Sequence, residues 1–288
     1  MELLLFLLLG AAIGILSGFF GIGGGIILTP LLLILGYAPS TAIVLSLLLT
    51  LGSTVTGTFA HLRQNNFHLR DAGTIGLAGI IGSAAVTPVV FWMEQHNGAD
   101  IIISTLYIVL LLLFAIQFLK PAKKIIRETP VPHASFYKLI AIGGAAGILS
   151  SLMGVSGGFL LTPLLMGWVR FPLKQAIGTS IAAATLIVLG GITSYFISGT
   201  QAPLGLGVVL IIGALLGSPL GASFLNLFST HFVKKSLGSF YAAVATSVFL
   251  KTTHHEQLSL LLLALFTTGL IGLFFYQKTV QRQTKDWP

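Results

Sequence analysis

The sequence predicts an all-α polytopic membrane protein, and three observations carry this prediction: an apolar composition, apolar blocks of membrane-crossing length and an internal repeat. Of the 288 residues, 55% belong to the hydrophobic set and only 8% are charged, with a mean hydropathy of +0.98. A soluble domain of this length needs far more charge to cover its surface. The apolar blocks run for about 20 residues, the length of helix that crosses a hydrocarbon core of about 30 Å. Backbone polar groups in lipid must be paired within the segment, so we expect helices surrounded by a lipid bilayer.

Charge and cysteine content exclude several function classes. The net charge of +8 would suggest nucleic acid in a soluble protein, but in a membrane protein it reflects Lys and Arg in cytoplasmic loops, so we expect no nucleic-acid partner. The chain has no cysteine, which leaves no disulfide, thiol catalysis or cysteine-bound metal. The start, MELLLFLLLG, lacks a basic region and a cleavage site, and it predicts a retained helix.

Two halves of the chain repeat each other. Residues 10–32, GAAIGILSGFFGIGGGIILTPLL, align without gaps with residues 143–165, GGAAGILSSLMGVSGGFLLTPLL, and 14 of the 23 positions are identical. Further along, Ala42, Ile43 and Ser46 match Ala176, Ile177 and Ser180, and Thr87-Pro88 matches Ser218-Pro219. The duplication therefore covers most of both halves.

Each half contains the same series of segments. A long apolar segment meets a glycine cluster, a short segment of about 11 residues follows, and three longer segments complete the half. The expected segments are 3–20, 26–36, 40–60, 72–93 and 101–119, then 138–153, 159–169, 174–197, 204–228 and 236–250, and last 258–276. We therefore expect a first transmembrane repeat (1–119), a cytoplasmic linker (120–137), a second transmembrane repeat (138–251) and an extra C-terminal transmembrane helix with a cytoplasmic tail (252–288).

The basic residues predict the orientation in the membrane. Placing the loop around residues 63–70, the stretch 120–138, the loops at 170–174 and 234–235 and the C-terminal tail in the cytoplasm puts 14 of the 15 Lys and Arg residues inside, with Lys251 as the exception. The protein then spans the cell inner (plasma) membrane with its N-terminus outside and its C-terminus in the cytoplasm. The two halves start on opposite sides, so they form inverted-topology repeats, an arrangement typical of secondary transporters.

The glycine clusters at Gly21–Gly25 and Gly154–Gly158 interrupt apolar runs that would otherwise form continuous helices. Two interpretations compete: close helix packing on small residues, which suits the stripe Gly10-Gly14-Gly18, and a broken or re-entrant helix. Consecutive glycines cannot all face one neighbour, so we expect breaks at both clusters. Unwound backbone at membrane depth is tolerated only when it is buried in protein or lines a wet cavity.

Hydroxyl–proline pairs occur at matching places in both halves, at Thr29-Pro30, Thr87-Pro88, Thr162-Pro163 and Ser218-Pro219. Such a pair can start a helix, with the hydroxyl as N-cap and proline at the first position. In mid-segment it marks a kink whose freed carbonyl needs another partner. In either case we expect helix N-termini from both halves to point inward.

No Asp, Glu, Lys, Arg or His falls deep inside an expected span, so we expect no catalytic residues, no metal site and no cofactor. What remains at that depth is glycine, hydroxyls and broken backbone. Helix N-termini bind anions without a cationic side chain, and together with hydroxyls they predict a site for a small oxyanion. The hydroxyls that could line it include Ser17, Ser46, Thr50, Ser53, Ser150, Ser156, Thr179 and Ser180.

These motifs carry a resemblance to a known family. The pair GILSGFFGIGGGIILTPLL and GILSSLMGVSGGFLLTPLL, with AIGTS at 176–180 and AHLRQNNFHLRDA at 60–72, resembles the sulfite exporter TauE/SafE family of permeases over nearly the whole chain. The resemblance implies a polytopic inner-membrane anion permease for substrates such as sulfite, sulfoacetate and related organosulfonates. It places functional residues at Gly23, Gly24, Gly25, Thr29, Pro30, Gly157, Gly158, Thr162 and Pro163. Ser156 stands where the first half has Gly23, and Leu45 stands where the second half has Thr179, so we expect the two halves to contribute unequally to the site.

Three hypotheses follow for the function. The first is a secondary permease for a small sulfur anion, coupled to protons or to sodium through carbonyls and hydroxyls, that works by alternating access between the repeats. The second is an uncoupled, channel-like anion pathway. The third is a membrane-embedded enzyme or assembly partner, whose active groups would have to lie in the loops at 61–71 or 120–138. The sequence does not fix the oligomeric state.

Overall fold

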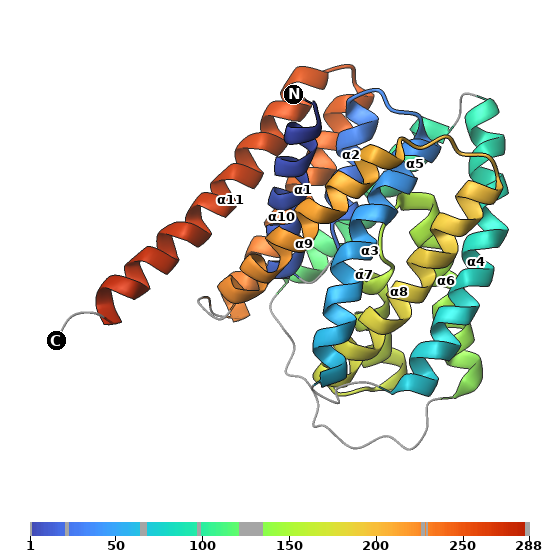
Figure 1. Ribbon diagram of the computed structural model, residues 1–288, viewed down its shortest axis with the longest axis horizontal. Coiled ribbons are helices and arrows are strands. Elements are labelled where there is room, and N and C mark those ends of the chain that lie inside the picture. The colour runs from blue at the N-terminus through green and yellow to red at the C-terminus, as the bar shows by residue number, and fades with distance from the viewer. Residues whose placement is uncertain are drawn as a thin grey trace.

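The computed structural model describes residues 2–20, 23–63, 68–96, 99–120, 135–225, 228 and 230–285, and within these ranges the chain forms helices and no strand. The first half contains α1 (Glu2–Phe20), α2 (Gly25–Ile34), α3 (Pro39–Arg63), α4 (Leu69–Gln95) and α5 (Ala99–Leu119). The second half contains α6 (Phe136–Met153), α7 (Gly158–Leu164), the π-helix η1 (Leu165–Val169), α8 (Leu173–Ile197), α9 (Leu204–Leu225) and α10 (Thr230–Thr252). The extra helix is α11 (Glu256–Lys285), which packs on α10 and tilts away from the bundle toward its C-terminal end (Figure 1).

The described helices fit a polytopic membrane protein, which confirms the predicted fold class. Eight of them are long and apolar enough to cross a membrane, and two shorter apolar helices cover 25–34 and 158–169. Large apolar side chains such as Leu77, Ile81 and Leu113 are exposed on the outside of the bundle, as expected for a surface in contact with lipid. The helix α10 is not among the eight, so a crossing by residues 236–250 stays a prediction.

The first helix of each half packs in parallel against the fourth helix of the other half. In α1 and α9, Gly10 faces Leu210, Gly14 faces Ala214 and Gly18 faces Ser218, and in α6 and α4, Gly143 faces Ile75 and Gly147 faces Gly79. At each of these glycines a Cβ would press on the backbone of the facing helix, so only glycine permits the approach. The aligned repeats make α6 the counterpart of α1 and α9 the counterpart of α4. The same type of interface therefore occurs twice: the first helix of each half packs on the fourth helix of the other half.

The third helices of the two halves, α3 and α8, run antiparallel through the middle of the bundle. The hydroxyl oxygens of Thr58 and Thr185 lie 2.9 Å apart, and nearer the start of α3 the side chain of Leu47 packs against Gly191. The start of α3 therefore lies beside the end of α8, and the end of α3 lies beside the earlier part of α8. Such a relation between counterpart helices is what inverted repeats require, but the sidedness of the two halves in a membrane stays a prediction.

Both long helices that lead into the glycine clusters are interrupted there. The first break lies between Phe20 and Gly25, where Gly23 has a φ of 75°, although Gly21 and Ile22 lie outside the described residues. The second break lies between Met153 and Gly158, where Gly154 and Gly157 have φ values of 66° and 68°. Residues with a side chain rarely adopt this left-handed conformation, so the glycines specify where the helices end.

The prolines do not start the short helices, so that interpretation of the hydroxyl–proline pairs is wrong. α2 begins at Gly25 and contains Pro30, and α7 begins at Gly158 and contains Pro163. Pro88 and Pro219 likewise lie inside α4 and α9. The mid-segment interpretation holds because glycine conformation, not proline, sets the start of each short helix. Since proline has no N–H, Pro30 removes the usual donor to the carbonyl of Ile26.

Candidate functional site

The two breaks meet at the interface between the halves. A Cβ at Gly25 would overlap the carbonyl oxygen of Gly154, so the start of α2 lies directly against the end of α6. A Cβ at Gly23 would lie 2.7 Å from Oγ of Ser156, which is the repeat counterpart of Gly23 itself. The structure therefore brings Gly23, Gly25 and Ser156, all expected site residues, to one point.

At the first break, a side chain from α3 caps the start of α2. The N–H of Gly25 donates to Oγ1 of Thr50 at 3.1 Å, and the amides of Ile27 and Leu28 donate to the carbonyl of Gly24 at 3.1 Å. Gly24 itself packs against the side chains of Leu49 and Ile13, where no Cβ fits. Part of the N-terminal amide set of α2 is thus already paired within the protein.

At the second break the start of α7 is also capped by a hydroxyl and a glycine carbonyl, but the hydroxyl comes from a different position. The N–H of Gly158 donates to Oγ of Ser156 at 3.3 Å, and the amides of Leu160 and Leu161 donate to the carbonyl of Gly157 at 3.0 and 2.9 Å. Gly24 and Gly157 are repeat counterparts, and each supplies the first carbonyl of a short helix. A serine of the break itself caps the second helix, whereas a threonine of α3 caps the first.

The hydroxyls after the breaks differ between the halves. Oγ1 of Thr162 and Oγ of Ser180 lie 2.8 Å apart, and Ser180 also donates to the carbonyl of Ile177 at 2.8 Å. Their counterparts Thr29 and Ser46 are fully buried, yet neither hydroxyl has a hydrogen-bond partner of normal geometry. The hydrogen bonding of the two halves therefore differs at these positions, while their unequal contribution to a binding site stays a prediction.

Three expected site residues, Thr179, Thr162 and Pro163, lie at the edge of this arrangement, and a fourth, Pro30, lies inside α2. Thr179 is buried, but its Oγ1 accepts a hydrogen bond of 3.4 Å from the N–H of His68, just before α4. The side chains of Thr162 and Pro163 are only partly buried, and Pro30 is buried within α2. This hydrogen bond ties Thr179 to the connection between α3 and α4 rather than to the breaks.

Two residues outside the expected set belong to the site. The hydroxyl of Tyr107, from α5, donates to the carbonyl of Met153, lies 3.5 Å from the carbonyl of Gly25 and sits beside the Thr29 side chain. The second residue is Gly154, whose carbonyl oxygen lies against Gly25 where the two breaks approach each other most closely. A tyrosine in the middle of an apolar span was the available signal for Tyr107, because a buried phenol needs a hydrogen-bond partner.

The carbonyl end of α6 receives two tyrosine hydroxyls. Tyr107 reaches Met153, and Tyr195 from α8 donates to the carbonyl of Ser151 at 2.6 Å. Helix C-terminal carbonyls have no partner within the helix and need one when buried. The site is therefore held by neutral hydroxyls, amides and carbonyls. No group of three or more His, Asp or Glu side chains that could share a metal ion occurs among the described residues.

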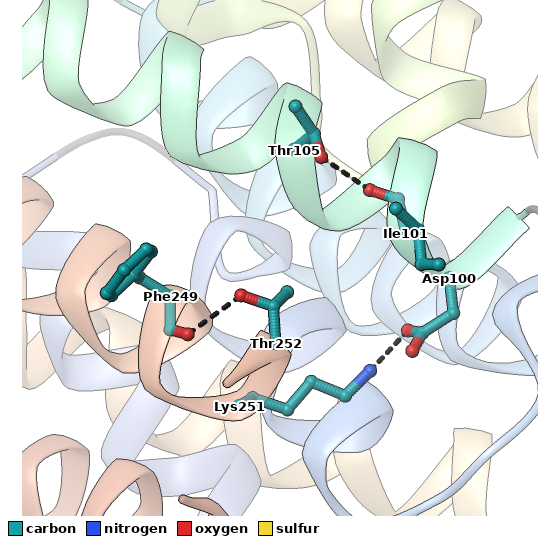
Figure 2. A network of polar contacts seen from close by, with 6 residues as sticks. All are labelled: Asp100, Ile101, Thr105, Phe249, Lys251 and Thr252. Carbon is teal, nitrogen blue, oxygen red and sulfur yellow. Dashed lines mark hydrogen bonds and ion pairs between the residues drawn. The ribbon is translucent and has the colours of Figure 1, made fainter. Parts of the chain in front are cut away.

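One cluster of charged groups lies where α5 begins, α10 ends and α11 begins. Figure 2 shows Lys251, at the end of α10, paired with the carboxylate of Asp100 at the start of α5. The pair borders an open cleft of about 460 Å³ that is also lined by Glu256 and the connection from α2 to α3. Lys251, the one basic residue that the predicted orientation places outside, is thus paired with an acidic side chain.

Apolar helices of membrane-crossing length, with two interrupted helices that meet between repeated halves, are features typical of a polytopic membrane transporter. Residues 6–248 match the sequence profile of the family described as Sulfite exporter TauE/SafE. The chain belongs to this family, which confirms the resemblance seen in the motifs.

Curated relatives carry the same general description. A probable membrane transporter protein of Haemophilus influenzae is 31% identical over 280 residues, covering 86% of this chain and 98% of the relative. A probable membrane transporter protein of Bacillus subtilis is 27% identical, covering 77% of this chain and 88% of the relative. Another, of Methanocaldococcus jannaschii, is also 27% identical, covering 68% of this chain and 73% of the relative. No solved structure matches the chain.

Proposed function

We propose that the protein is an inner-membrane permease for a small sulfur anion, such as sulfite or an organosulfonate like sulfoacetate, and that it works by alternating access between its halves. The observation that carries the proposal is the contact of the two breaks, with Gly25 against Gly154 and Gly23 against Ser156. Broken helices that meet at a repeat interface are where secondary transporters hold their substrates.

The chemistry of the breaks favours a compact oxyanion. The N-terminus of α2 carries a partial positive charge, and the hydroxyls of Thr50 and Ser156 lie beside the glycines that form it. Hydroxyls and amides supply several short donors around one point, which suits an anion with several acceptor oxygens. The family description names sulfite, and a sulfonate presents the same group of oxygens.

The close approach of the breaks supports alternating access over an uncoupled channel. No solute fits between Gly25 and Gly154 at their present separation, so passage requires the two halves to move apart at this point. Thr162 and Ser180 are paired whereas Thr29 and Ser46 are not, and this difference supports the proposal that the halves occupy different local states. Exchange of the two states between the halves is the motion that alternating access requires.

We also propose an orientation for the protein. The basic residues favour a cytoplasmic linker and C-terminus and an external N-terminus. The start of α1 and the end of α11 lie toward opposite ends of the bundle (Figure 1). The cleft beside Asp100 and Lys251 would then open to the outside.

Transport of labelled sulfite and sulfoacetate into proteoliposomes tests the function. Replacing Ser156 with Ala, or Thr50 with Val, is expected to lower the flux about tenfold, the effect of losing one hydrogen bond to an anion. Thr105→Val is the matched control, because this exposed hydroxyl bonds only the carbonyl of Ile101 in its own helix (Figure 2). Absence of flux for both anions in the unmodified protein would contradict the substrate assignment.

Two further measurements separate the alternatives. A permease coupled to protons or sodium accumulates the anion above equilibrium when the matching gradient is imposed, whereas a channel never exceeds equilibrium. If the protein instead acted as an enzyme or scaffold, replacing the loops at 61–71 or 120–138 would abolish its function while Gly24→Ala and Gly157→Ala left it intact. We expect the opposite pattern.

A further inference from the structure

Three buried hydroxyls belong to the three helices that meet at Gly154, and the hydroxyl of Thr29 lies directly against it. Thr29, Ser46 and Ser150 each have no measurable exposure, and none of the three hydroxyl oxygens has a hydrogen-bond partner of normal geometry. Burying a hydroxyl without a partner costs free energy, and such groups in a native structure usually mark a ligand or a functional requirement. Two of the three stand in the first half and one in the second.

The backbone contacts place the three hydroxyls around the second break. A Cβ at Gly154 would press on Oγ1 of Thr29 and would lie 3.0 Å from Cα of Ile43. Ser46 follows Ile43 by one turn of α3, and Ser150 precedes Gly154 by one turn of α6, on the same helix face. The three side chains thus come from three helices that converge at the end of α6.

The surrounding atoms are oxygen acceptors rather than amide donors. The carbonyls of Met153 and Gly25 and the hydroxyl of Tyr107 lie at the same point. Pro30 lacks an N–H, so the carbonyl of Ile26 also loses its usual donor from the helix. The C-terminal end of α6 adds a partial negative charge. Hydroxyls and carbonyls near a negative helix end form a favourable environment for a hard monovalent cation.

We propose that Thr29, Ser46 and Ser150, with backbone carbonyls at the second break, bind one sodium ion, and that this ion is the coupling ion of the permease. The proposal rests on the proposed function for its coupling role. The cation lies next to the N-terminus of α2, where the anion is expected, because Gly25 touches Gly154. A sodium ion and a monovalent anion at adjacent points stabilise each other in a buried, neutral site.

The second half offers no equivalent cation site in this state. The counterparts of Thr29 and Ser46 are Thr162 and Ser180, and their hydroxyls bond each other at 2.8 Å. The hydroxyl of Ser180 also donates its proton to the carbonyl of Ile177, so both hydroxyls of this pair already have hydrogen-bond partners. One sodium ion per chain is therefore expected.

Thermal unfolding of the purified protein in detergent tests the cation site without any anion transport. Sodium chloride is expected to raise the unfolding temperature over the same concentration of choline chloride, because a ligand that binds only the folded state stabilises it by mass action. Ser46→Ala and Ser150→Ala are each expected to weaken the apparent sodium affinity about tenfold, as for a lost ligand. Thr200→Val is the matched control, since the Thr200 hydroxyl is also buried without a partner but lies in the connection between α8 and α9.

The outcomes separate this proposal from the proposed function. An equal unfolding temperature in sodium, potassium and choline chloride overturns the sodium site, and so does a sodium response that Ser46→Ala and Ser150→Ala leave unchanged. If labelled sulfite is then still carried, the permease assignment stands without sodium coupling. A sodium response that follows these variants, in a protein that carries neither sulfite nor sulfoacetate, keeps the site and removes the substrate assignment.

Discussion

Oγ1 of Thr162 and Oγ of Ser180 lie 2.8 Å apart, and their hydrogen bond joins the short helix α7 to the long helix α8. The equivalent residues of the first half, Thr29 and Ser46, make no such bond. A repeat protein whose halves exchange roles during a transport cycle would make this bond in one half at a time.

Locking the Thr162–Ser180 contact is expected to stop transport. The chain contains no cysteine, so the double variant Thr162→Cys/Ser180→Cys introduces the only two thiols. Side chains whose end atoms touch are close enough for a disulfide, so mild oxidation should join α7 to α8. We expect sulfite flux in proteoliposomes to fall to background after oxidation and to return after reduction. In each single cysteine variant the same oxidation should leave the flux at that variant's own unoxidised level. Undiminished flux in the cross-linked double variant would show that this contact does not open.

The doubled small-residue interface predicts matched losses of stability. Gly147→Ala would press a Cβ into the carbonyl oxygen of Gly79, and Gly14→Ala, its repeat counterpart, would do the same at Ala214. Each is expected to destabilise the protein by about 1–3 kcal/mol, the usual cost of overpacking. Thermal unfolding in detergent measures the change. Gly144→Ala is the control on the same helix, because open space surrounds that position, and it should stay within about 0.5 kcal/mol.

The Asp100–Lys251 pair is expected to respond unequally to removal of its two partners. The Lys251 side chain is 11% exposed, whereas Asp100 is 49% exposed. Asp100→Asn leaves a nearly buried ammonium without its partner and should cost about 3 kcal/mol. Lys251→Gln leaves a carboxylate that water can reach and should cost less than about 1 kcal/mol. Chemical or thermal unfolding gives both values, and equal losses would show that the burial of Lys251 does not matter.

The hydroxyl of Tyr107 is expected to support the end of α6. Tyr107→Phe removes the donor to the carbonyl of Met153, keeps the ring and should cost about 1 kcal/mol. Tyr195→Phe, which removes the donor to the carbonyl of Ser151, should cost a similar amount. Only the Tyr107 variant should also alter anion flux, because Tyr107 alone of the two sits beside Thr29 and Gly25. Identical flux in both variants would place Tyr107 outside the transport site.

The sequence predicted most of the helices and both breaks because their signals are local. Apolar length locates each span, and GIGGG and GVSGG remove side chains where the backbone turns left-handed. The sequence offers two starts for α2, because Thr29-Pro30 also has the pattern of a helix start. The structure places that start at Gly25, where the amide is capped by Thr50, a residue 25 positions away. A capping residue so far along the chain cannot be recognised from the sequence next to the helix that it caps.

The candidate site was predictable only in outline for the same reason. The repeat identified Gly23 and Ser156 as equivalent positions, but not that these two counterparts face each other across the interface. Similarly, the stripe Gly10-Gly14-Gly18 predicted close packing without naming α9 as its partner. The unequal hydrogen bonding of Thr29 and Thr162 follows from side-chain geometry, which identical local sequences do not encode.

The exchanged pairing of α1 with α9 and of α6 with α4 means that neither half contains the partner of its own first helix. A polypeptide with one half alone would leave its glycine stripe uncovered until it met a second copy lying antiparallel to it. Covalent fusion of the two copies turns that encounter between chains into an intramolecular step. It also allows the copies to diverge, so that each can acquire chemistry that a symmetric pair could not hold.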